Sequence, residues 1–298
     1  MRSRLRGTLS ATKYVLIMLP GLICWFVLAV WPHLEVIPMA FYKWNGYSSN
    51  KLFVGWQNFE MFFNSTGFSE GLKNTVLYVF FLLAVQTVLA VLLAIALKRN
   101  TGQNRFFRTF FFLPLVFSSV MVGLTWGYIF DPNLGMLNQL LGAMGFGGFE
   151  SYYWLGEPAR AVFLVVLVHI WANIGYPLTL LTAALQGIPQ QLYEAAQVEG
   201  ATAAKQFKRI TFPLLMPTLL RIGLLTILTG AMTFDYIFLL GSSGYANDYD
   251  TWAVSIYRGL AGSNMGIPSA IGVLLGAVLF VIFLIQFVVT KKVEDSIS

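Results

Sequence analysis

Six long apolar segments constrain this chain more than any other feature of its sequence. A helix that crosses a bilayer needs about 20 mostly apolar residues. Lipid offers no partner to a free backbone N–H or C=O group, so such segments form helices. The predicted fold is therefore an all-α polytopic membrane protein, a single domain over residues 1–298. The six predicted spans are Lys13–Pro32, Thr75–Leu97, Phe110–Phe130, Ala161–Leu185, Pro217–Leu240 and Pro268–Thr290.

The composition excludes several classes of protein. Hydrophobic residues make up 57% of the chain and charged residues only 11%, against about 25% charged residues in a soluble domain. A soluble enzyme, a disordered tail and a nucleic-acid-binding domain are therefore excluded, despite the net charge of +6. With one cysteine, Cys24, the chain cannot form an internal disulfide, and with two histidines it offers little to a metal ion. We expect no metal site and no nucleic-acid partner.

The basic residues orient the predicted spans. Of the 19 lysines and arginines, 14 lie on the side that holds both termini and five on the other. The positive-inside rule then places both termini in the cytoplasm and the chain in the cytoplasmic membrane. A cleaved signal peptide over the first 30 residues is the alternative. No small-residue cleavage site follows the apolar run, so we expect the first helix to be retained.

The most informative segment is cytoplasmic and covers residues 187–217, between the fourth and fifth spans. Residues 190–199 are predicted to be helical, and Gly200 can adopt a positive φ that ends the helix. Thr202 is suited to cap a second helix, which we expect Pro213 to end. A loop that only linked two spans would be shorter than this.

The first of these short helices has the composition of a docking surface. The small side chains of Ala195 and Ala196 let another surface approach closely, and the neighbouring carboxylate of Glu194 can accept charge-assisted hydrogen bonds. The alternative is an amphipathic helix that rests on the lipid surface.

This segment resembles the EAA loop of the membrane subunits of binding-protein-dependent ABC importers. The similarity rests on Glu194-Ala195-Ala196, followed by Gly200, Ile210 and Pro213. The longer string is similar to the sugar-importer branch, in which Asp usually stands at the position of Glu199. The outer stretch Phe53–Phe59 also resembles that family, and the resemblance covers about residues 14–290. The larger maltose permease subunit and the glycerol-phosphate permease are the most similar types.

The resemblance implies a coupling helix that sits in a cleft of a cytoplasmic ATPase. Glu194 would contact the ATPase, Ala195 and Ala196 would pack in its cleft, and Glu199 and Gly200 would complete the coupling turn. This sequence contains no Gly-x-x-x-x-Gly-Lys-Ser/Thr loop. We therefore expect no catalytic residue and no cofactor in this chain, with ATP and Mg²⁺ bound by partner subunits. The implied partners are a second homologous permease subunit, two cytoplasmic ATP-binding subunits, an extracytoplasmic solute-binding protein, a sugar and membrane lipid.

Residues of the fourth span are candidates for substrate contact. Trp171, Ile174, Gly175 and Leu178 are spaced i, i+3, i+4 and i+7, so they share one helix face. Aromatic rings stack on the C–H surface of sugars, which makes Trp171 a candidate platform. The Gly-Tyr-Pro string at Gly175 resembles the helix that lines the sugar site of the maltose permease. The alternative is that Gly175 only permits tight helix packing.

The fifth span offers a second polar face, formed by Thr226, Gly230 and Thr233, although small residues also serve helix packing. Asp235 lies nearer the outer end of this span, where we expect a structural bond to a neighbour. We likewise expect His169 to hydrogen-bond another helix. Weaker candidates for substrate contact are Gln86, Ser118 and Ser119.

The predicted function is a permease subunit of an ATP-driven importer that moves a sugar or oligosaccharide by alternating access. Glycerol phosphate and other small polar solutes stay open as cargo, but a phosphate favours cavity Arg or Lys, which the middles of the spans lack. A proton-coupled carrier needs titratable groups along its path, and only His169 and Asp235 lie within the spans. A membrane enzyme would need a catalytic constellation, which the spans do not contain.

Overall fold

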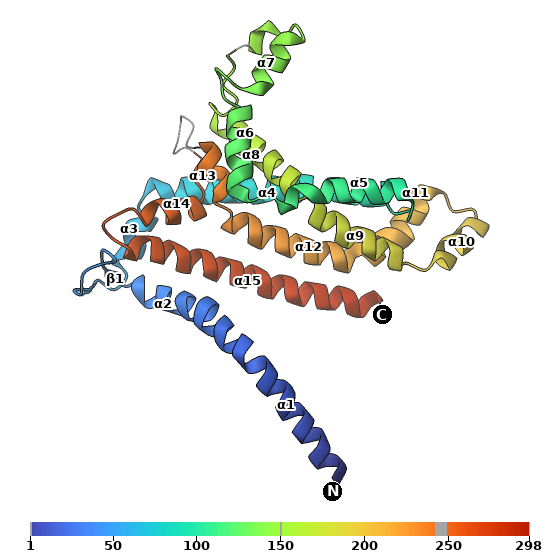
Figure 1. Ribbon diagram of the computed structural model, residues 1–298, viewed down its shortest axis with the longest axis horizontal. Coiled ribbons are helices and arrows are strands. Elements are labelled where there is room, and N and C mark those ends of the chain that lie inside the picture. Colours follow the sequence, from blue (N-terminus) through green and yellow to red (C-terminus); the bar gives the residue numbers. More distant parts are fainter. Residues whose placement is uncertain (1, 150, 242–248, 298) are drawn as a thin grey trace. The chain divides into compact units, whose positions relative to one another are not determined.

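The computed structural model describes residues 2–149, 151–241 and 249–297 (Figure 1). It divides into two compact units. Unit 1 comprises Met1–Asn64 and Arg258–Leu274, and unit 2 comprises Ser65–Tyr257 and Leu275–Ser298. Helix α15 (Gly266–Ile297) begins in unit 1 and ends in unit 2.

Unit 1 combines a long helical rod with a short hairpin. In chain order it contains α1 (Arg2–Trp25), the π-helix η1 (Phe26–Val30), α2 (Trp31–Met39), β1 (Tyr42–Lys43), β2 (Leu52–Phe53) and α3 (Gln57–Phe63). The two strands are antiparallel, with Tyr42 opposite Phe53 and Lys43 opposite Leu52. This hairpin is a small departure from the all-α expectation.

All the secondary-structure elements in the described part of unit 2 are helices. It contains α4 (Thr66–Ala96), α5 (Gly102–Phe112), the 3-10 helix η2 (Leu113–Val116), α6 (Ser119–Ile129), α7 (Met136–Ala143), the 3-10 helix η3 (Gly147–Phe149), α8 (Pro158–Asn173), α9 (Gly175–Gly187), α10 (Gln190–Val198), α11 (Ala203–Gln206), the π-helix η4 (Phe207–Thr211), α12 (Phe212–Met232), α13 (Asp235–Gly241) and α14 (Trp252–Gly259).

Among the described residues, four helical stretches are long and apolar enough to cross a membrane, and the number rises to six if each of two bent pairs forms one span. The four are Lys13–Met39, Thr66–Ala96, Ala203–Met232 and Gly266–Asp295. Three predicted spans are shorter than these helices because the helices continue beyond the apolar core. The fifth, Pro217–Leu240, is wrong at its end, because α12 stops at Met232 and residues beyond the break belong to α13. The bent pairs are α5–η2 with α6, at 96°, and α8 with α9, at 54°.

The sequence predicts one helix over Phe110–Phe130, but the structure bends within this range, so the prediction is wrong. Pro114 lacks a backbone N–H and lies in the 3-10 turn η2. Phe117 and Ser118 then have extended backbone, with ψ of 144° and 139°. Helix α6 therefore starts afresh at Ser119 in a new direction.

At two positions a proline is the second residue of an α-helix that directly follows a π-helix. One of them contradicts the prediction made for Pro213. Pro213 does not end the helix that follows Thr202. It is the second residue of α12, directly after the π-helix η4, and Pro32 follows the π-helix η1 in the same way. A proline ring clashes with the carbonyl four residues earlier in an α-helix. The wider π-helical turn relieves that contact, so both helices continue past their proline.

The core of unit 2 is built around α4, which packs against α8, α9 and α12 (Figure 1). One face of α4 is buried at four-residue intervals, by Tyr78, Leu82, Gln86, Ala90 and Ala94. Apolar residues on other faces of α4 remain exposed, such as Phe80 and Val88 at 60% and 57%. A helix with an apolar exposed face is expected where the surrounding solvent is lipid.

Candidate functional site

A polar cavity of about 420 Å³ lies inside unit 2. Six helical elements contribute to its lining, so residues far apart in the sequence meet there. The lining residues are Gln86 of α4, Leu115 of η2, His169 and Asn173 of α8, Tyr176 of α9, Leu225, Thr226 and Thr229 of α12, Thr233 of the α12–α13 break, and Asp235 and Tyr236 of α13.

A hydrogen-bond network holds one wall of this cavity. The Tyr78 hydroxyl lies 2.7 Å from Nδ1 of the buried His169. Asn173 donates from its amide to the backbone carbonyl of His169 at 3.0 Å and to the Tyr236 hydroxyl at 3.3 Å. The prediction that His169 bonds another helix is confirmed, since Tyr78 belongs to α4. This network ties α4, α8 and α13 together.

Asp235 marks a break between α12 and α13. Thr233 has extended backbone with ψ of 124°, and α13 begins at Asp235. The Ser119 hydroxyl, at the first residue of α6, donates to Oδ2 of Asp235 at 2.5 Å. The predicted structural bond of Asp235 is therefore confirmed, and the same side chain also lines the cavity.

Gln86 carries an unused hydrogen-bond acceptor. Its side chain is only 6% exposed, and its Oε1 has no partner within the described part of the chain. A buried polar atom without a partner costs about 1–3 kcal/mol. Because Gln86 lines the cavity, a hydroxyl donor that entered the cavity could satisfy this oxygen.

The four candidates of the fourth span do not line this cavity. Trp171 is 44% exposed and packs edge-on against Trp126, with ring centroids 5.6 Å apart. Ile174 and Leu178 are buried in the hydrophobic core. A Cβ on Gly175 would lie 2.6 Å from Cα of Phe112, so this glycine is a point of close packing.

Of the three candidates in the fifth span, two line the cavity and one does not. Thr226 and Thr233 line the cavity. Gly230 instead faces α4, where an added Cβ would lie 2.9 Å from Cδ2 of Leu82. Of the weaker candidates, Gln86 lines the cavity, Ser119 supports it through Asp235, and Ser118 is the N-cap of α6.

Sequence reasoning missed the lining residues Asn173, Tyr176, Thr229 and Tyr236. A signal was present, because His169, Asn173 and Tyr176 are spaced i, i+4 and i+7 and so share a face. This polar face lies next to the one formed by Trp171 and Leu178. The preference for an aromatic platform selected the wrong face for this cavity.

A second polar cavity, of about 400 Å³, extends the same helix face. Thr179, Ala183 and Gln186 of α9 continue the spacing of His169, Asn173 and Tyr176 in steps of three or four residues. Helix α5 forms the opposite wall with Arg108, Thr109 and Phe112. Figure 1 shows α5 and α9 next to each other at the end of unit 2 that carries α10 and α11.

The coupling segment, residues 187–217, has a well-defined turn. Helix α10 covers Gln190–Val198, close to the predicted bounds, and Gly200 has φ of +76° as expected. The N–H of Gly200 bonds the carbonyl of Gln197 at 2.9 Å, and the N–H of Ala201 bonds that of Ala196 at 2.8 Å. This pair of bonds is a Schellman motif, which needs a residue with positive φ.

The second half of the segment is anchored at two points. The Thr202 side chain accepts from the N–H of Lys205 at 3.4 Å, which confirms the predicted N-cap. The hydroxyl of Tyr193 lies 2.9 Å from Oγ1 of Thr211, so α10 is tied to η4. The segment is therefore a folded element and not a loose linker.

The outward face of this segment carries the predicted coupling residues. Glu194, Ala195, Glu199 and Gly200 are exposed, and Ala196 is half-buried. The apolar side chain of Val198 is 90% exposed. Within the described residues, no hydrogen bond or ion pair of the Glu194 side chain is present.

The sequence of the chain matches the profile of one protein family. The profile of the family described as "Binding-protein-dependent transport system inner membrane component" matches residues 86–295, well over half of the chain. This match includes both cavities and the coupling segment.

Individual relatives agree with the family. The probable ABC transporter permease protein YurN of Bacillus subtilis is 32% identical over 286 residues, which cover 94% of this chain and 97% of that protein. The diacetylchitobiose uptake system permease protein NgcF of Streptomyces coelicolor is 30% identical, with 83% of this chain and 73% of that protein covered.

A solved structure shows the same fold. It is a crystal structure of a bacterial alginate ABC transporter in complex with an alginate pentasaccharide-bound periplasmic protein. One of its chains superimposes with a TM-score of 0.78 at 27% identity, covering 97% of this chain and 98% of that one. The chain therefore belongs to the inner membrane components of binding-protein-dependent transport systems, and it is an ABC transporter permease, a transport subunit and not an enzyme.

Proposed function

We propose that this permease imports a neutral sugar or oligosaccharide, and that the solute passes through the polar cavity of unit 2. The proposal includes six membrane spans, with each bent helix pair counted as one, and both termini in the cytoplasm. It treats residues 1–298 as one transmembrane permease domain that carries the coupling segment.

One observation carries the proposal, namely the unused acceptor of Gln86 in a cavity whose lining includes several neutral polar side chains. Amide and hydroxyl groups of Asn173, Tyr176 and Thr229 surround the same space. A sugar hydroxyl can both donate to Gln86 Oε1 and accept from such groups. A polyhydroxylated solute therefore fits the chemistry of the lining.

The charge of the lining argues against a phosphate cargo. Asp235 is the one charged residue among those that line the cavity, and it is acidic. A phosphate or carboxylate in this space would face the Asp235 carboxylate with no lysine or arginine beside it. This observation favours a neutral sugar over glycerol phosphate. The relative that is named for diacetylchitobiose uptake and the solved alginate transporter support a saccharide as the cargo. Alginate is described as an acidic polysaccharide, so the choice of a neutral sugar rests on Asp235 and not on that neighbour.

The polar face of α8 and α9 provides a route from one cavity to the next. His169, Asn173 and Tyr176 line the first cavity, and Thr179 and Gln186 line the second. The second cavity lies near the coupling segment, because α9 ends at Gly187 where that segment begins. A solute that leaves the first cavity towards the cytoplasm would follow this face.

The coupling segment would transmit the work of ATP hydrolysis. We propose that Glu194, Ala195, Ala196, Glu199 and Gly200 contact one of two cytoplasmic ATP-binding subunits, which bind ATP and Mg²⁺. Tyr193 ties this surface to η4, and η4 continues into α12, which lines the cavity. A movement of α10 would therefore reach the solute path as a rigid-body displacement. A second homologous permease and an extracytoplasmic solute-binding protein complete the assembly.

Uptake into proteoliposomes tests this function. The complete transporter would be supplied with ATP and with neutral saccharides, glycerol phosphate or a proton gradient alone. We expect ATP-dependent uptake of a neutral saccharide. Uptake of glycerol phosphate only, or uptake driven by protons without ATP, would overturn the proposal.

A pair of variants localises the solute. Gln86→Leu removes the unused acceptor, and we expect the solute concentration for half-maximal uptake to rise about tenfold. Thr87→Val is the matched control, because Oγ1 of Thr87 is also buried without a partner but Thr87 does not line the cavity. Equal effects of the two variants would place the solute elsewhere.

A further inference from the structure

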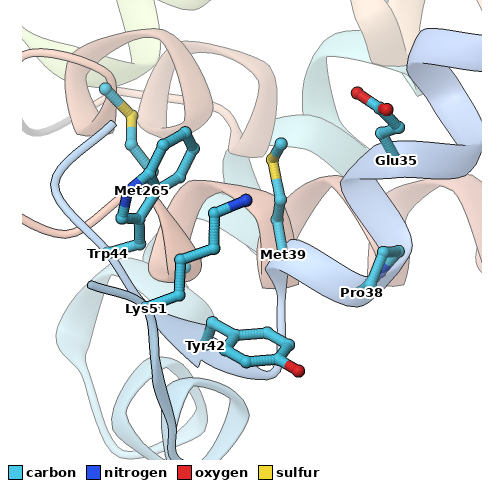
Figure 2. A pocket seen from close by; sticks show the side chains of 8 residues that line it. Glu35, Pro38, Met39, Tyr42, Trp44, Lys51 and Met265 are labelled. Atoms are coloured by element: carbon cyan, nitrogen blue, oxygen red, sulfur yellow. The ribbon is translucent and has the colours of Figure 1, made fainter. Parts of the chain in front are cut away.

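Unit 1 contains a separate pocket of about 300 Å³ (Figure 2). Glu35 and Met39 of α2 form one wall, and Tyr42 and Trp44, of β1 and the residues after it, form the floor. Lys51 and Met265 complete the lining. Lys51 lies just before the outer stretch Phe53–Phe59 that resembles the importer family, and the transport route through unit 2 gives this pocket no role.

The walls of this pocket are fixed by a buried amide pair. Asn58, only 1% exposed, donates to the backbone carbonyls of Ala40 and Tyr42 at 2.8 and 3.0 Å. Its Oδ1 accepts from Asn264 at 3.0 Å. The N–H of Met265 then bonds the carbonyl of Trp44 at 2.7 Å. Two segments more than 200 residues apart in the sequence are thereby held in one geometry, so the pocket is preformed.

Two opposite charges face the pocket without neutralising each other. The Lys51 ammonium lies 4.3 Å from the centroid of the Trp44 ring, and Figure 2 shows it directed across the pocket. The Glu35 carboxylate, on the other side, accepts from Nε1 of Trp31 at 2.9 Å. Among the described residues no ion pair joins Lys51 to Glu35. Both groups keep hydrogen-bonding capacity for a third partner.

The lining combines features that are typical of a protein interface. Between the two charges it presents two thioethers, Met39 and Met265, and two aromatic rings, Tyr42 and Trp44. Methionine and aromatic residues are enriched at protein interfaces, where a few anchor side chains fill such pockets. The cavity of unit 2, by contrast, offers threonine, asparagine and glutamine to a hydroxylated solute.

We propose that this pocket receives an apolar side chain of the extracytoplasmic solute-binding protein, flanked there by an acidic residue opposite Lys51 and a basic residue opposite Glu35. The inference rests on the proposed function, which places this loop outside the cytoplasm. The pocket would orient the binding protein on the permease, while the solute is released to the cavity of unit 2.

Charge reversal tests the docking. The measurement is ATP hydrolysis by the complete transporter as a function of the concentration of the solute-binding protein that stimulates the unmodified transporter. For Lys51→Glu and for Glu35→Lys we expect the half-saturating concentration to rise about tenfold, with the maximal rate unchanged. Lys43→Glu is the control, since Lys43 is exposed on β1 but does not line the pocket, and we expect less than about a twofold change.

Protection of a thiol tests occupancy directly. Cys24 is the single native cysteine, so Met39→Cys in a Cys24→Ser background places one thiol in the pocket. We expect the binding protein to slow its alkylation about tenfold, and the solute alone to have no effect. Met61→Cys, at an exposed methionine of α3 outside the lining, provides the control.

The outcomes separate this inference from the proposed function. If the transporter imports a saccharide and responds to its binding protein, but Lys51→Glu behaves like Lys43→Glu, the pocket is not the docking site. Protection of the Met39→Cys thiol by the solute alone would make the pocket a solute site and overturn the inference. Absence of ATP-dependent uptake would overturn the proposed function itself.

Discussion

The cavity of unit 2 and the coupling segment are built in opposite ways. The cavity gathers side chains from six helical elements, and bonds from neighbouring helices hold some of them, as Tyr78 holds His169 and Ser119 holds Asp235. The coupling segment is one short stretch of chain. The geometry of its turn comes from backbone hydrogen bonds around Gly200, and most side chains of α10 and of this turn are exposed.

Because of this difference, we expect substitutions in the two regions to impair the protein in different ways. A change in the coupling segment should leave the fold intact and disturb what the segment contacts, because few internal contacts depend on it. A change in the cavity network should first reduce stability, because each polar group there supports a neighbouring helix. The variants below test this contrast, from the largest expected effect to the smallest.

Gly200→Val should have the largest effect on transport. Valine is strongly disfavoured at a φ of +76°, so the Schellman turn would rearrange and move the coupling residues. We expect ATP-dependent uptake in vesicles to fall by more than about tenfold, since left-handed backbone costs a side chain about 1–2 kcal/mol even without a branch at Cβ. Solute binding to the cavity should be unchanged.

Gly187→Ala is the control for this variant, because an added Cβ there meets nothing within 4 Å and its backbone is not left-handed. Normal uptake by Gly200→Val would show that the turn is not required for coupling.

Gly175→Ala should have the largest effect on folding. The new Cβ would lie 2.6 Å from Cα of Phe112 and 2.8 Å from the carbonyl oxygen of Phe111, so the backbone of α5 would have to shift. Such overpacking costs about 1–3 kcal/mol. We expect a lower thermal-unfolding midpoint of the purified permease. Gly223→Ala, whose Cβ would meet only ordinary contacts beyond 3.5 Å, should not lower it. Equal midpoints for the two variants would contradict the close packing at the bend.

Tyr78→Phe should destabilise the cavity network by about 1–2 kcal/mol, because the buried Nδ1 of His169 would lose its partner. The thermal-unfolding midpoint again provides the measurement. Tyr128→Phe serves as the control, since Tyr128 is 77% exposed. If both variants unfold at the temperature of the unmodified chain, the Tyr78–His169 bond contributes nothing to stability.

The same contrast explains what the sequence could predict. The first half of the coupling segment depends on residues that are close in sequence, such as Thr202 as an N-cap and Gly200 as a stop, so local rules placed α10 and its turn correctly. The same rules wrongly ended the next helix at Pro213. The apolar spans were also recognised from their length. The break at Phe117 and Ser118 was missed, because Pro114 permits several local conformations and tertiary packing selects one.

The residues that line the cavity could be predicted only in part, and the reason is physical. Helix periodicity identifies residues that share a face, but it does not say which face meets a cavity and which meets a neighbouring helix. Gly175 and Leu178 lie against other helices, whereas Asn173 and Tyr176 on the adjacent face line the cavity. That choice depends on α4, α12 and α13, whose positions no local pattern encodes.

Glu194→Lys should have the smallest effect on stability of all these variants. Glu194 is exposed and bonds no other described residue, so we expect the free energy of unfolding of the permease alone to change by less than about 0.5 kcal/mol. The yield of ATP-binding subunits that co-purify with the permease should nevertheless fall, because a lysine would face the partner groups that a carboxylate attracts. Glu70→Lys makes the same charge change at an exposed position of α4 and should leave that yield unchanged. Lower stability with a normal yield of ATP-binding subunits would instead show that this position matters for the fold of the permease and not for binding of those subunits.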